Sequence, residues 1–162
     1  KNTDTTPESY YDFGKWSELS YGMQVPFGSA NVGKPSMDSD ARMPLAADKG
    51  PFGAFEEGNK ADPGTVTANH NSTPEQWKTW NSPNHSGGEG QNALYSDGHA
   101  DFLKLAIEGV VRDNIYTRWT EEKPNFSSTS DADIHKYVRG TQPSSGSNKI
   151  TPFATTDSLI YP

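Results

Sequence analysis

The segment Asn92-Ala-Leu-Tyr-Ser-Asp-Gly-His-Ala-Asp-Phe-Leu103 contains two short runs of strand-forming residues, one on each side of Asp97-Gly98. Asp-Gly between two such runs is among the strongest short-range signals for a β-hairpin. Glycine accepts the positive φ that a tight hairpin turn requires, and aspartate tolerates it better than most residues do. The segment therefore predicts a β-hairpin whose loop consists of the two residues Asp97 and Gly98.

A two-residue loop also determines which residues lie opposite one another in the predicted hairpin. It places Ser96 opposite His99, and side chains then alternate between the two faces of the ribbon. The face that we expect to point into the core contains Ala93, Tyr95, Ala100 and Phe102. The face that we expect to point away from the core contains Leu94, Ser96, His99, Asp101 and Leu103.

Outside the hairpin, the sequence predicts further strands and little helix. Apolar, β-branched or aromatic runs indicate extended segments at residues 19–25, 43–47, 105–111 and 113–119, and an edge strand at 159–161. A helical turn is expected after Thr73-Pro74, with Ser72 or Thr73 as its cap. A short helix is expected from Ser130 to Gly140.

These elements predict a single domain over residues 1–162 of the α+β class, dominated by strands. We expect an antiparallel sheet with a central β-hairpin and long loops around it. Residues 1–9 and 141–162 are expected to be loosely packed or extended, because they are rich in polar and turn-forming residues.

The composition permits only a thin hydrophobic core. Hydrophobic residues make up 31% of the 162 residues, and aromatic residues make up 11%. Phe, Tyr and Trp therefore carry much of the apolar surface that can be buried. A chain of this kind gains stability from a bound metal, a partner surface or another segment that packs against it.

The charge and the absence of cysteine exclude several classes of function. The formal net charge is −7 and no stretch gathers lysine and arginine, which argues against a nucleic-acid partner. Without cysteine the chain forms neither disulfides nor thiolate metal sites. No run of about 18 apolar residues is present, so none of these residues is predicted to cross a bilayer.

The stretch from Asn81 to Phe102, NSPNHSGGEGQNALYSDGHADF, resembles a family motif. It is similar to the His-x-Gly-Gly … Asp-Gly-His motif of planctomycete-type prepilin-processing-associated proteins, which are type II secretion pseudopilin-like or type IV pilin-like. The matching positions are His85, Gly87, Gly88, Asn92, Leu94, Tyr95, Asp97, Gly98 and His99. Residues 20–27, 44–51 and 112–117 also resemble this family, so the similarity covers roughly residues 16–117. The spacing from His85 to Asp97 is longer than in the family motif.

The resemblance implies a pilin-like soluble head domain in the bacterial cell envelope or outside the cell. Such a head normally packs its sheet on a long N-terminal helix, which these residues lack. Attachment to a membrane is therefore expected only through a segment that precedes Lys1. The implied function is that of a non-catalytic structural or assembly subunit, whose partners are copies of itself or related pilin-like subunits.

Histidine and carboxylate side chains in and near the hairpin form a candidate metal site. The candidates in this part of the chain are His70, His85, His99, Glu89, Asp97 and Asp101. A site between the glycine-rich loop (residues 85–90) and the hairpin turn would use His85, Asp97 and His99, which suit zinc or another divalent ion. Calcium is the metal that the resemblance to pseudopilins implies. The alternative is that Asp97 only makes the turn, His99 is an exposed strand residue, and His85 fixes the glycine-rich loop by hydrogen bonding.

Two further classes of function stay open at this point. One is a secreted or surface module that binds glycans on aromatic side chains, although packing in the core is the commoner fate of such residues. The aromatic candidates are Trp77, Trp80, Trp119, Tyr10 and Tyr11. The other is a metal-dependent hydrolase. No Gly-x-Ser-x-Gly elbow is present, and Gly87–Gly90 lacks the Lys-Ser/Thr ending of a phosphate-binding loop, so we predict that the protein is not an enzyme.

Overall fold

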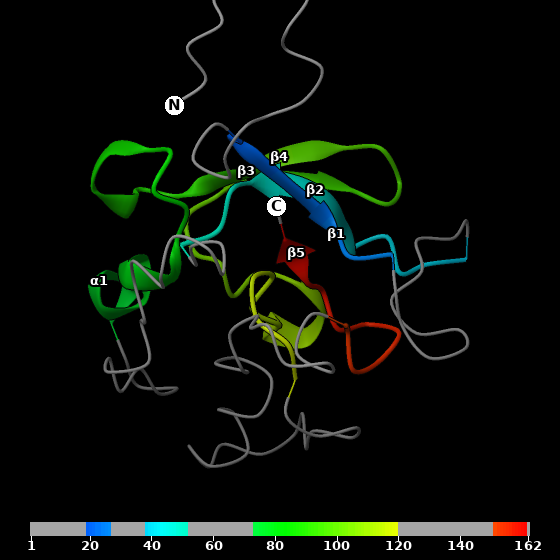
Figure 1. The fold of residues 1–162 in the computed structure, drawn as a ribbon. Helices are drawn as coiled ribbons and strands as arrows, with labels where there is room; N and C mark the ends of the chain where they lie inside the picture. Colours follow the sequence, from blue (N-terminus) through cyan, green and yellow to red (C-terminus); the bar gives the residue numbers. More distant parts are fainter. Residues whose placement is uncertain (1–18, 27–37, 52–72, 120–150, 162) are drawn as a thin grey trace, which may run out of the picture.

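The computed structural model describes residues 19–26, 38–51, 73–119 and 151–161 of the chain (Figure 1). These residues form a five-stranded antiparallel sheet in the order β4-β3-β2-β1-β5. The strands are β1 (Tyr21–Gln24), β2 (Pro44–Asp48), β3 (Gln91–Tyr95), β4 (Ala100–Leu103) and β5 (Ile160–Tyr161). Helical structure in the described residues consists of α1 (Pro74–Trp77) and the 3₁₀ turns Lys78–Trp80, Ser86–Gly88 and Val110–Arg112. None of these helices has the length and apolar character that a membrane span needs.

The prediction of a strand-dominated antiparallel sheet is confirmed. The run predicted as a strand at residues 19–25 contains β1, and the run at 43–47 contains all of β2 except its last residue, Asp48. The predicted edge strand near the C-terminal end is β5. The predicted helical turn is α1, in which the Gln76 side-chain oxygen accepts the backbone N–H of Thr73 over 2.8 Å. The hairpin of β3 and β4 is also present, but it lies at one edge of the sheet. The expectation of a central hairpin is therefore wrong, since β2 is the middle strand.

The hairpin loop contains three residues instead of the predicted two. The backbone N–H of Tyr95 donates to the carbonyl oxygen of His99 over 2.9 Å, and the N–H of Gly98 donates to the carbonyl oxygen of Tyr95 over 3.0 Å. Ser96, Asp97 and Gly98 thus make the reversal, and Gly98 has a φ of +89°. A turn followed by a glycine in the left-handed region is the usual form of a three-residue hairpin loop.

The additional loop residue shifts the register by one position and turns β4 over. Leu94 lies opposite Ala100, and Asn92 lies opposite Phe102. Leu103, which we expected to face away from the core, is buried with 3% exposure, whereas the predicted core residue Phe102 is 43% exposed. Ala100, also predicted to be in the core, is exposed. The reason is the side-chain period of two in a strand, because a slip of one residue exchanges the two faces.

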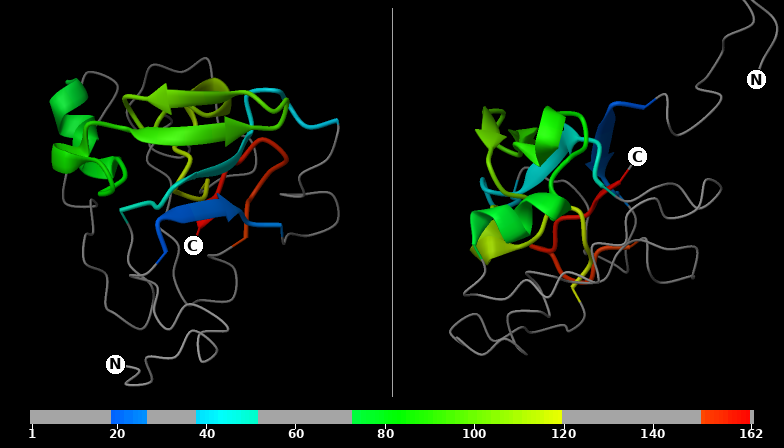
Figure 2. Two further views of the ribbon diagram at one scale, coloured as in Figure 1. Left: turned by 90° about the horizontal axis from the view of Figure 1, so that it is seen from above. Right: turned by 90° about the vertical axis from the view of Figure 1, so that its left-hand side faces the viewer.

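The core lies between one face of the sheet and a layer of irregular chain. Figures 1 and 2 show that residues 104–119 (yellow-green) and 151–160 (orange to red) lie together on this inner side of the sheet. Tyr116 is completely buried there, and its hydroxyl donates to the carbonyl oxygen of Asp48 over 2.8 Å. The buried core cluster consists of Ala47, Trp77, Trp80, Ala93, Tyr95, Leu103, Ala106, Ile107, Ile115, Tyr116, Trp119 and Ile160.

Residues 105–111 and 113–119 are not the extended segments that the sequence predicted. The chain makes the 3₁₀ turn Val110–Arg112 and then a second turn, in which the backbone N–H of Tyr116 donates to Oδ1 of Asn114 over 3.1 Å. The carbonyl oxygen of Asn114 accepts the N–H of Thr117 over 3.1 Å. A short polar side chain that binds the local backbone competes with sheet formation, and here it outweighs the β-branched neighbours.

The C-terminal part of the chain packs more tightly than predicted. Within the range 141–162, expected to be loosely packed, residues 157–160 are buried, with Leu159 at 0% and Ile160 at 1% exposure. Residues 1–9 and the predicted helix from Ser130 to Gly140 lie outside the described residues.

The buried carboxamide of Asn81 fixes the segment of residues 81–90 against the rest of the fold. Nδ2 of Asn81 donates to the carbonyl oxygen of Gly88 over 2.8 Å and to that of Lys104 over 2.7 Å. Oδ1 of the same side chain accepts the N–H of Ala106 over 2.9 Å. The glycine-rich loop thereby has a defined position, although it contains no strand.

Gly88 packs too closely against the 3₁₀ turn Lys78–Trp80 to carry a side chain. A Cβ at Gly88 would lie 2.8 Å from the carbonyl oxygen of Lys78, whereas a Cβ at Gly87 would meet nothing within 4 Å. Both glycines have a positive φ, so alanine at either position carries about 1 kcal/mol of backbone strain.

We therefore expect Gly88→Ala to lower the free energy of unfolding by about 1–3 kcal/mol more than Gly87→Ala does, because only the former adds overpacking. Urea denaturation of the two variants measures the difference, and Gly87→Ala is the control for strain. Equal losses would contradict the close contact at Gly88.

Candidate functional site

His85 is held by a buried carboxylate at the end of β2. Its Nε2 atom lies 3.0 Å from Oδ2 of Asp48, whose side chain is 4% exposed, while the His85 side chain is 36% exposed. An ionised carboxylate only accepts hydrogen bonds, so the imidazole donates its Nε2–H to Asp48. The carboxylate thereby fixes both the tautomer and the orientation of the ring.

Asp48 also binds the beginning of β3 and the loop before it. Its Oδ2 accepts the backbone N–H of Asn92 over 2.6 Å and the side-chain amide of Asn92 over 3.1 Å. Its Oδ1 accepts Nδ2 of Asn84 over 3.3 Å, and the same amide donates to the carbonyl oxygen of Ser20. Asp48 is thus a common acceptor that joins β2, β3 and the glycine-rich loop.

His85 packs on an exposed aromatic ring of the sheet. Its ring meets that of Phe102 edge to face, with a centroid distance of 5.2 Å and an interplanar angle of 86°. Phe102 belongs to the side of the sheet that faces away from the core. The exposed large apolar residues on this side are Tyr21, Met23, Leu94 and Phe102, with exposed fractions of 66%, 70%, 42% and 43%. We refer to these four residues and Ala46 as the outer face.

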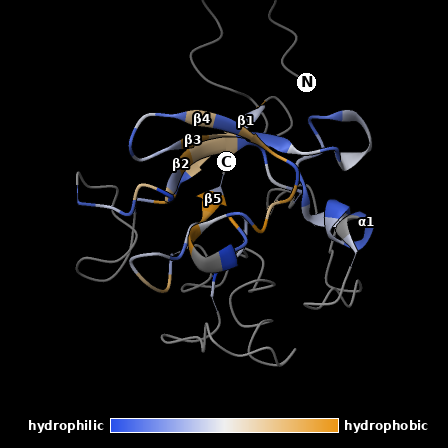
Figure 3. Cartoon of the chain, turned by 180° about the vertical axis from the view of Figure 1, so that it is seen from behind, coloured by the Kyte–Doolittle hydropathy of each residue, from blue (hydrophilic) through white to orange (hydrophobic). Residues whose placement is uncertain are grey.

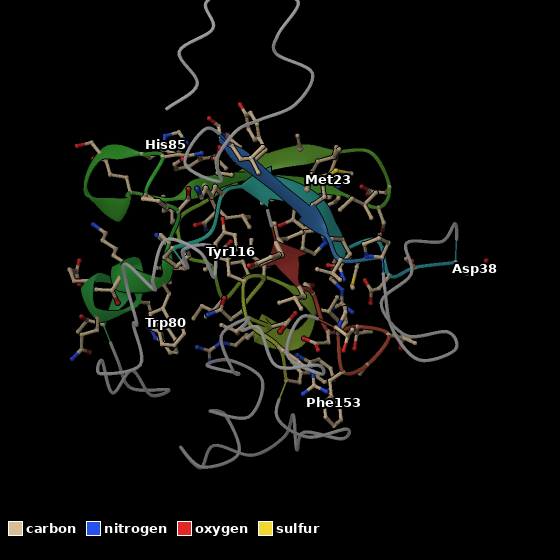
Figure 4. All side chains as sticks on the ribbon, viewed as in Figure 1. Met23, Asp38, Trp80, His85, Tyr116 and Phe153 are labelled. Atoms are coloured by element: carbon tan, nitrogen blue, oxygen red, sulfur yellow. The ribbon has the colours of Figure 1, made fainter. Side chains whose placement is uncertain are left out.

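The register places the outer face across four neighbouring strands. Met23 lies opposite Ala46, which in turn lies opposite Leu94. Figure 3 shows hydrophobic colours along β2, β3 and β5, and Figure 4 shows Met23 and His85 on the side of the sheet away from Tyr116. The residues form one surface because successive side chains on one side of a strand are two positions apart.

The outer face carries almost no charge. The only charged residues in the five strands are Asp48 and Asp101. Asp101 lies opposite Ala93, and both therefore point to the other side of the ribbon. Asp48 is covered by His85 and its other hydrogen-bond partners. The outer face is thus an apolar surface on a chain whose formal net charge is −7.

Asp97 and His99 form a separate contact inside the hairpin loop. Oδ1 of Asp97 accepts the backbone N–H of His99 over 3.1 Å and lies 2.5 Å from Nδ1 of the same histidine. These two hydrogen bonds lower the pKa of the Asp97 carboxyl. The ring of His99 stacks on that of Tyr95 with a centroid distance of 4.4 Å. The Asp97 side chain therefore serves to build the turn.

The structure does not assemble the predicted metal site from His85, Asp97 and His99. His85 contacts Phe102 on the outer face, whereas His99 stacks on Tyr95, which projects from the opposite side of the ribbon. In the described part of the chain, no group of three or more His, Asp or Glu side chains is placed to hold a metal ion. His85 instead takes the role given above as the alternative, a hydrogen bond that fixes the glycine-rich loop.

The tryptophans that were candidates for a glycan-binding platform belong to the core. Trp77, Trp80 and Trp119 are 2%, 3% and 2% exposed, so they offer no surface for a sugar ring to stack on. The aromatic platform built on these three residues is therefore wrong. The other candidates Tyr10, Tyr11 and His70 lie outside the described residues.

A pair of buried aspartates, which sequence reasoning missed, joins two distant segments. Asp113 accepts Nε1–H of Trp119 over 2.7 Å and the backbone N–H of Ser158 over 2.7 Å. Asp157 accepts the backbone N–H of Trp119 over 3.2 Å and that of Phe153. Both aspartates are completely buried. They therefore bind the segment before residue 120 to the segment after residue 150.

Burial raises the pKa of both aspartates. Removal from water raises the pKa of Asp113 well above its ordinary value, and the nearby charge of Asp157 raises it further. Burial also raises the pKa of Asp157 to about 7, against the hydrogen bonds from the backbone and the charge of Arg118, which lower it. No local pattern marks this pair, because the two residues are far apart in the sequence.

Comparison with known proteins gives no relative for this chain. No protein-family model matches it, and neither does any curated protein or solved structure. The function is therefore inferred from the geometry described above and from the motif resemblance.

We expect Asp48→Ala to destabilise the protein much more than His85→Ala. Loss of the carboxylate removes the common acceptor of the backbone and side-chain N–H groups of Asn92 and of the amide of Asn84, and costs about 3 kcal/mol or more. Loss of the partly exposed imidazole removes one hydrogen bond worth about 1 kcal/mol. Urea denaturation of both variants and of the double variant measures the two costs and their coupling. Equal costs, or full additivity in the double variant, would show that Asp48 does not act through these contacts.

The raised pKa of Asp157 predicts a pH dependence of stability. Since the folded-state pKa is about 7 and the unfolded value is about 3.9, the folded state binds more protons between these limits. The contribution of Asp157 to stability therefore falls as pH rises from about 4 to about 7, and is constant above that. We expect Asp157→Asn to remove this dependence, so the free energy of unfolding of the variant, relative to that of the wild type, should be highest at about pH 8. A stability difference between the two proteins that is independent of pH would contradict this.

Proposed function

We propose that the protein is a non-catalytic assembly subunit of the bacterial cell envelope, pilin-like or pseudopilin-like, and that the outer face is its contact surface. The observation that carries the proposal is the exposure of Tyr21, Met23, Leu94 and Phe102 on one uncharged side of the sheet. A contiguous apolar patch on a water-soluble surface marks an interaction site. Aromatic residues and methionine are enriched, and charged residues depleted, in the centre of protein interfaces.

The arrangement of large and small side chains on the outer face suits an α-helix. Ala46 lies between Met23 and Leu94 in the register, so the surface is lower along β2 than along β1 and β3. These two flanking strands are about 10 Å apart, which is close to the diameter of an α-helix. We therefore assign the outer face to an apolar helix of a pilin-like subunit.

The motif resemblance supports the same assignment. Its histidine, His85, packs on Phe102 at one end of the outer face and is held there by Asp48. The motif thus maintains the surface that the proposal uses. The formal net charge of −7 favours a protein partner over nucleic acid. The partners that we propose are copies of this protein or related pilin-like subunits, in the cell envelope or outside the cell.

The pair of His85 and Asp48 is assigned a positioning role instead of a catalytic one. Nε2 of His85 contacts only Asp48 and the amide of Asn92 in the described part of the chain, and no hydroxyl is hydrogen-bonded to it there. A histidine that acts as a general base must reach the group whose proton it removes. Its edge-to-face contact instead supports the ring of Phe102.

Photo-crosslinking from the outer face tests the proposal. The photoreactive residue p-benzoylphenylalanine is placed at Met23 of the protein produced in its native host, and cross-linked peptides are identified by mass spectrometry. We expect an apolar, helix-forming segment of a pilin-like protein, or of this protein itself. The same residue at Glu75, which is exposed on α1, is the control and is expected to give no such product.

A second variant distinguishes loss of contact from loss of folding. Leu94→Lys places a charge on the outer face and is expected to abolish the cross-link from position 23. Because Leu94 is 42% exposed, the free energy of unfolding should change by no more than about 0.5 kcal/mol. Cross-links to polysaccharide alone, or the same products from positions 23 and 75, would reject the proposal.

A further inference from the structure

A pocket of about 490 Å³ lies beside the 3₁₀ turn Val110–Arg112, among residues that the proposed assembly function does not use. It is lined by Arg42, Leu105, Ile107, Glu108, Gly109 and Arg112. Ile107 is buried in the core cluster and Leu105 packs against it, so the apolar lining is continuous with the core. The pocket is an open depression on the surface, which gives a small molecule room to bind while part of it stays in contact with water.

Arg112 is held in a strained backbone conformation at this pocket. Its φ is +64°, and it is the only non-glycine residue with a positive φ in the described part of the chain. The turn is fixed by hydrogen bonds from the N–H of Arg112 to Gly109 and from the N–H of Asp113 to Val110, both over 3.1 Å. Glycine would fit this conformation without strain, and strained residues of this kind cluster at functional sites.

The guanidinium of Arg112 is available to a ligand. No hydrogen bond or ion pair joins it to another side chain among the residues that the structure describes. The carboxylate of Glu108 likewise has no ion pair within that part of the chain. The pocket therefore carries one cationic and one anionic group that have no side-chain partner among the described residues, next to apolar side chains.

Arg42, the other arginine of the pocket, is fixed by a two-point contact with Asp40. Its Nε lies 2.9 Å from Oδ1 and its Nη2 lies 2.6 Å from Oδ2 of this aspartate. The side-chain hydrogen bond from Arg42 lowers the pKa of Asp40 to about 2, so the aspartate is ionised at physiological pH. Two arginines and two carboxylates then balance in charge around the pocket. A multiply charged anion would be repelled by Glu108 and Asp40 as much as it is attracted by the arginines.

We propose that this pocket binds a small zwitterion with an aliphatic side chain, namely a free aliphatic amino acid. The ligand carboxylate pairs with Arg112, since a guanidinium matches the geometry of a carboxylate. The ligand ammonium pairs with Glu108, and the aliphatic chain lies on Leu105 and Ile107. This inference is independent of the outer face and of any partner bound there.

Titration with L-leucine, followed by ¹H–¹⁵N correlation spectra of the whole chain, tests the proposal. 4-Methylpentanoate lacks the ammonium group of leucine, and 3-methylbutylamine lacks its carboxylate. We expect leucine to shift the resonances of residues 105–112 in a saturable manner, and each analogue to bind at least tenfold more weakly. Inorganic phosphate is expected not to compete with leucine.

The variant Arg112→Gly separates binding from folding. Glycine suits the positive φ, so thermal unfolding should occur at the same or a higher temperature, while leucine binding should weaken at least tenfold. Lys104→Ala removes an equal charge from an exposed position outside the pocket and should bind leucine as the wild type does. Unchanged binding by Arg112→Gly, equal binding of leucine and 4-methylpentanoate, or the absence of saturable shifts with leucine would each overturn the proposal.

Discussion

Hydrogen bonds between buried polar side chains and the backbone of the loops are what the rest of this structure depends on. The strands are short, so many backbone groups of the described loops have no partner in the sheet, and a buried backbone group needs one. Side chains that are 3% exposed or less supply such partners, among them Asp48, Asn81, Gln91, Asp113 and Asp157. A hydrogen bond contributes about 0.5–1.5 kcal/mol when both partners are neutral, and about 1.5–3 kcal/mol when one of them is ionised. A few of these bonds can therefore fix loops in a chain that is only 31% hydrophobic.

The cost of a buried carboxylate differs between the two places where the fold uses it. Asp48 lies at the end of β2 beside the half-exposed His85, and several N–H groups share its charge. Asp113 and Asp157 lie in one region of the interior, where burial raises both pKa values and the charge of Asp157 raises that of Asp113 further. The backbone N–H groups around them offset part of that cost. The two segments that meet there are thus joined by an interaction whose strength depends on proton binding. The outer face is supported instead by Asp48 and the N–H groups that donate to it.

Local signals in the sequence predicted the local elements, but they did not indicate which distant residues are in contact. Asp97-Gly98 predicted the hairpin, and Thr73-Pro74 predicted the helical turn, because turn and cap chemistry acts within a few residues. The partner of His85 is Asp48, 37 positions away, and nothing around either residue indicates the other. The role of His85 as a support of the glycine-rich loop was nevertheless among the alternatives that the sequence offered. The pairing of Asp113 with Asp157 had no local signal at all.

The observed register of the hairpin explains how the outer face arises. Asp-Gly is compatible with loops of two or three residues, and the two choices place opposite sides of β4 against the core. With two residues, Phe102 would be buried and Asp101 would project beside Leu94, which would put a charge on the outer side of the sheet. With the observed loop of three residues, the side chain of Asp101 points away from the outer face, and Phe102 lies with Leu94 on that face. The single additional loop residue therefore converts a charged surface into an apolar one, and it places Phe102 where the ring of His85 can pack against it.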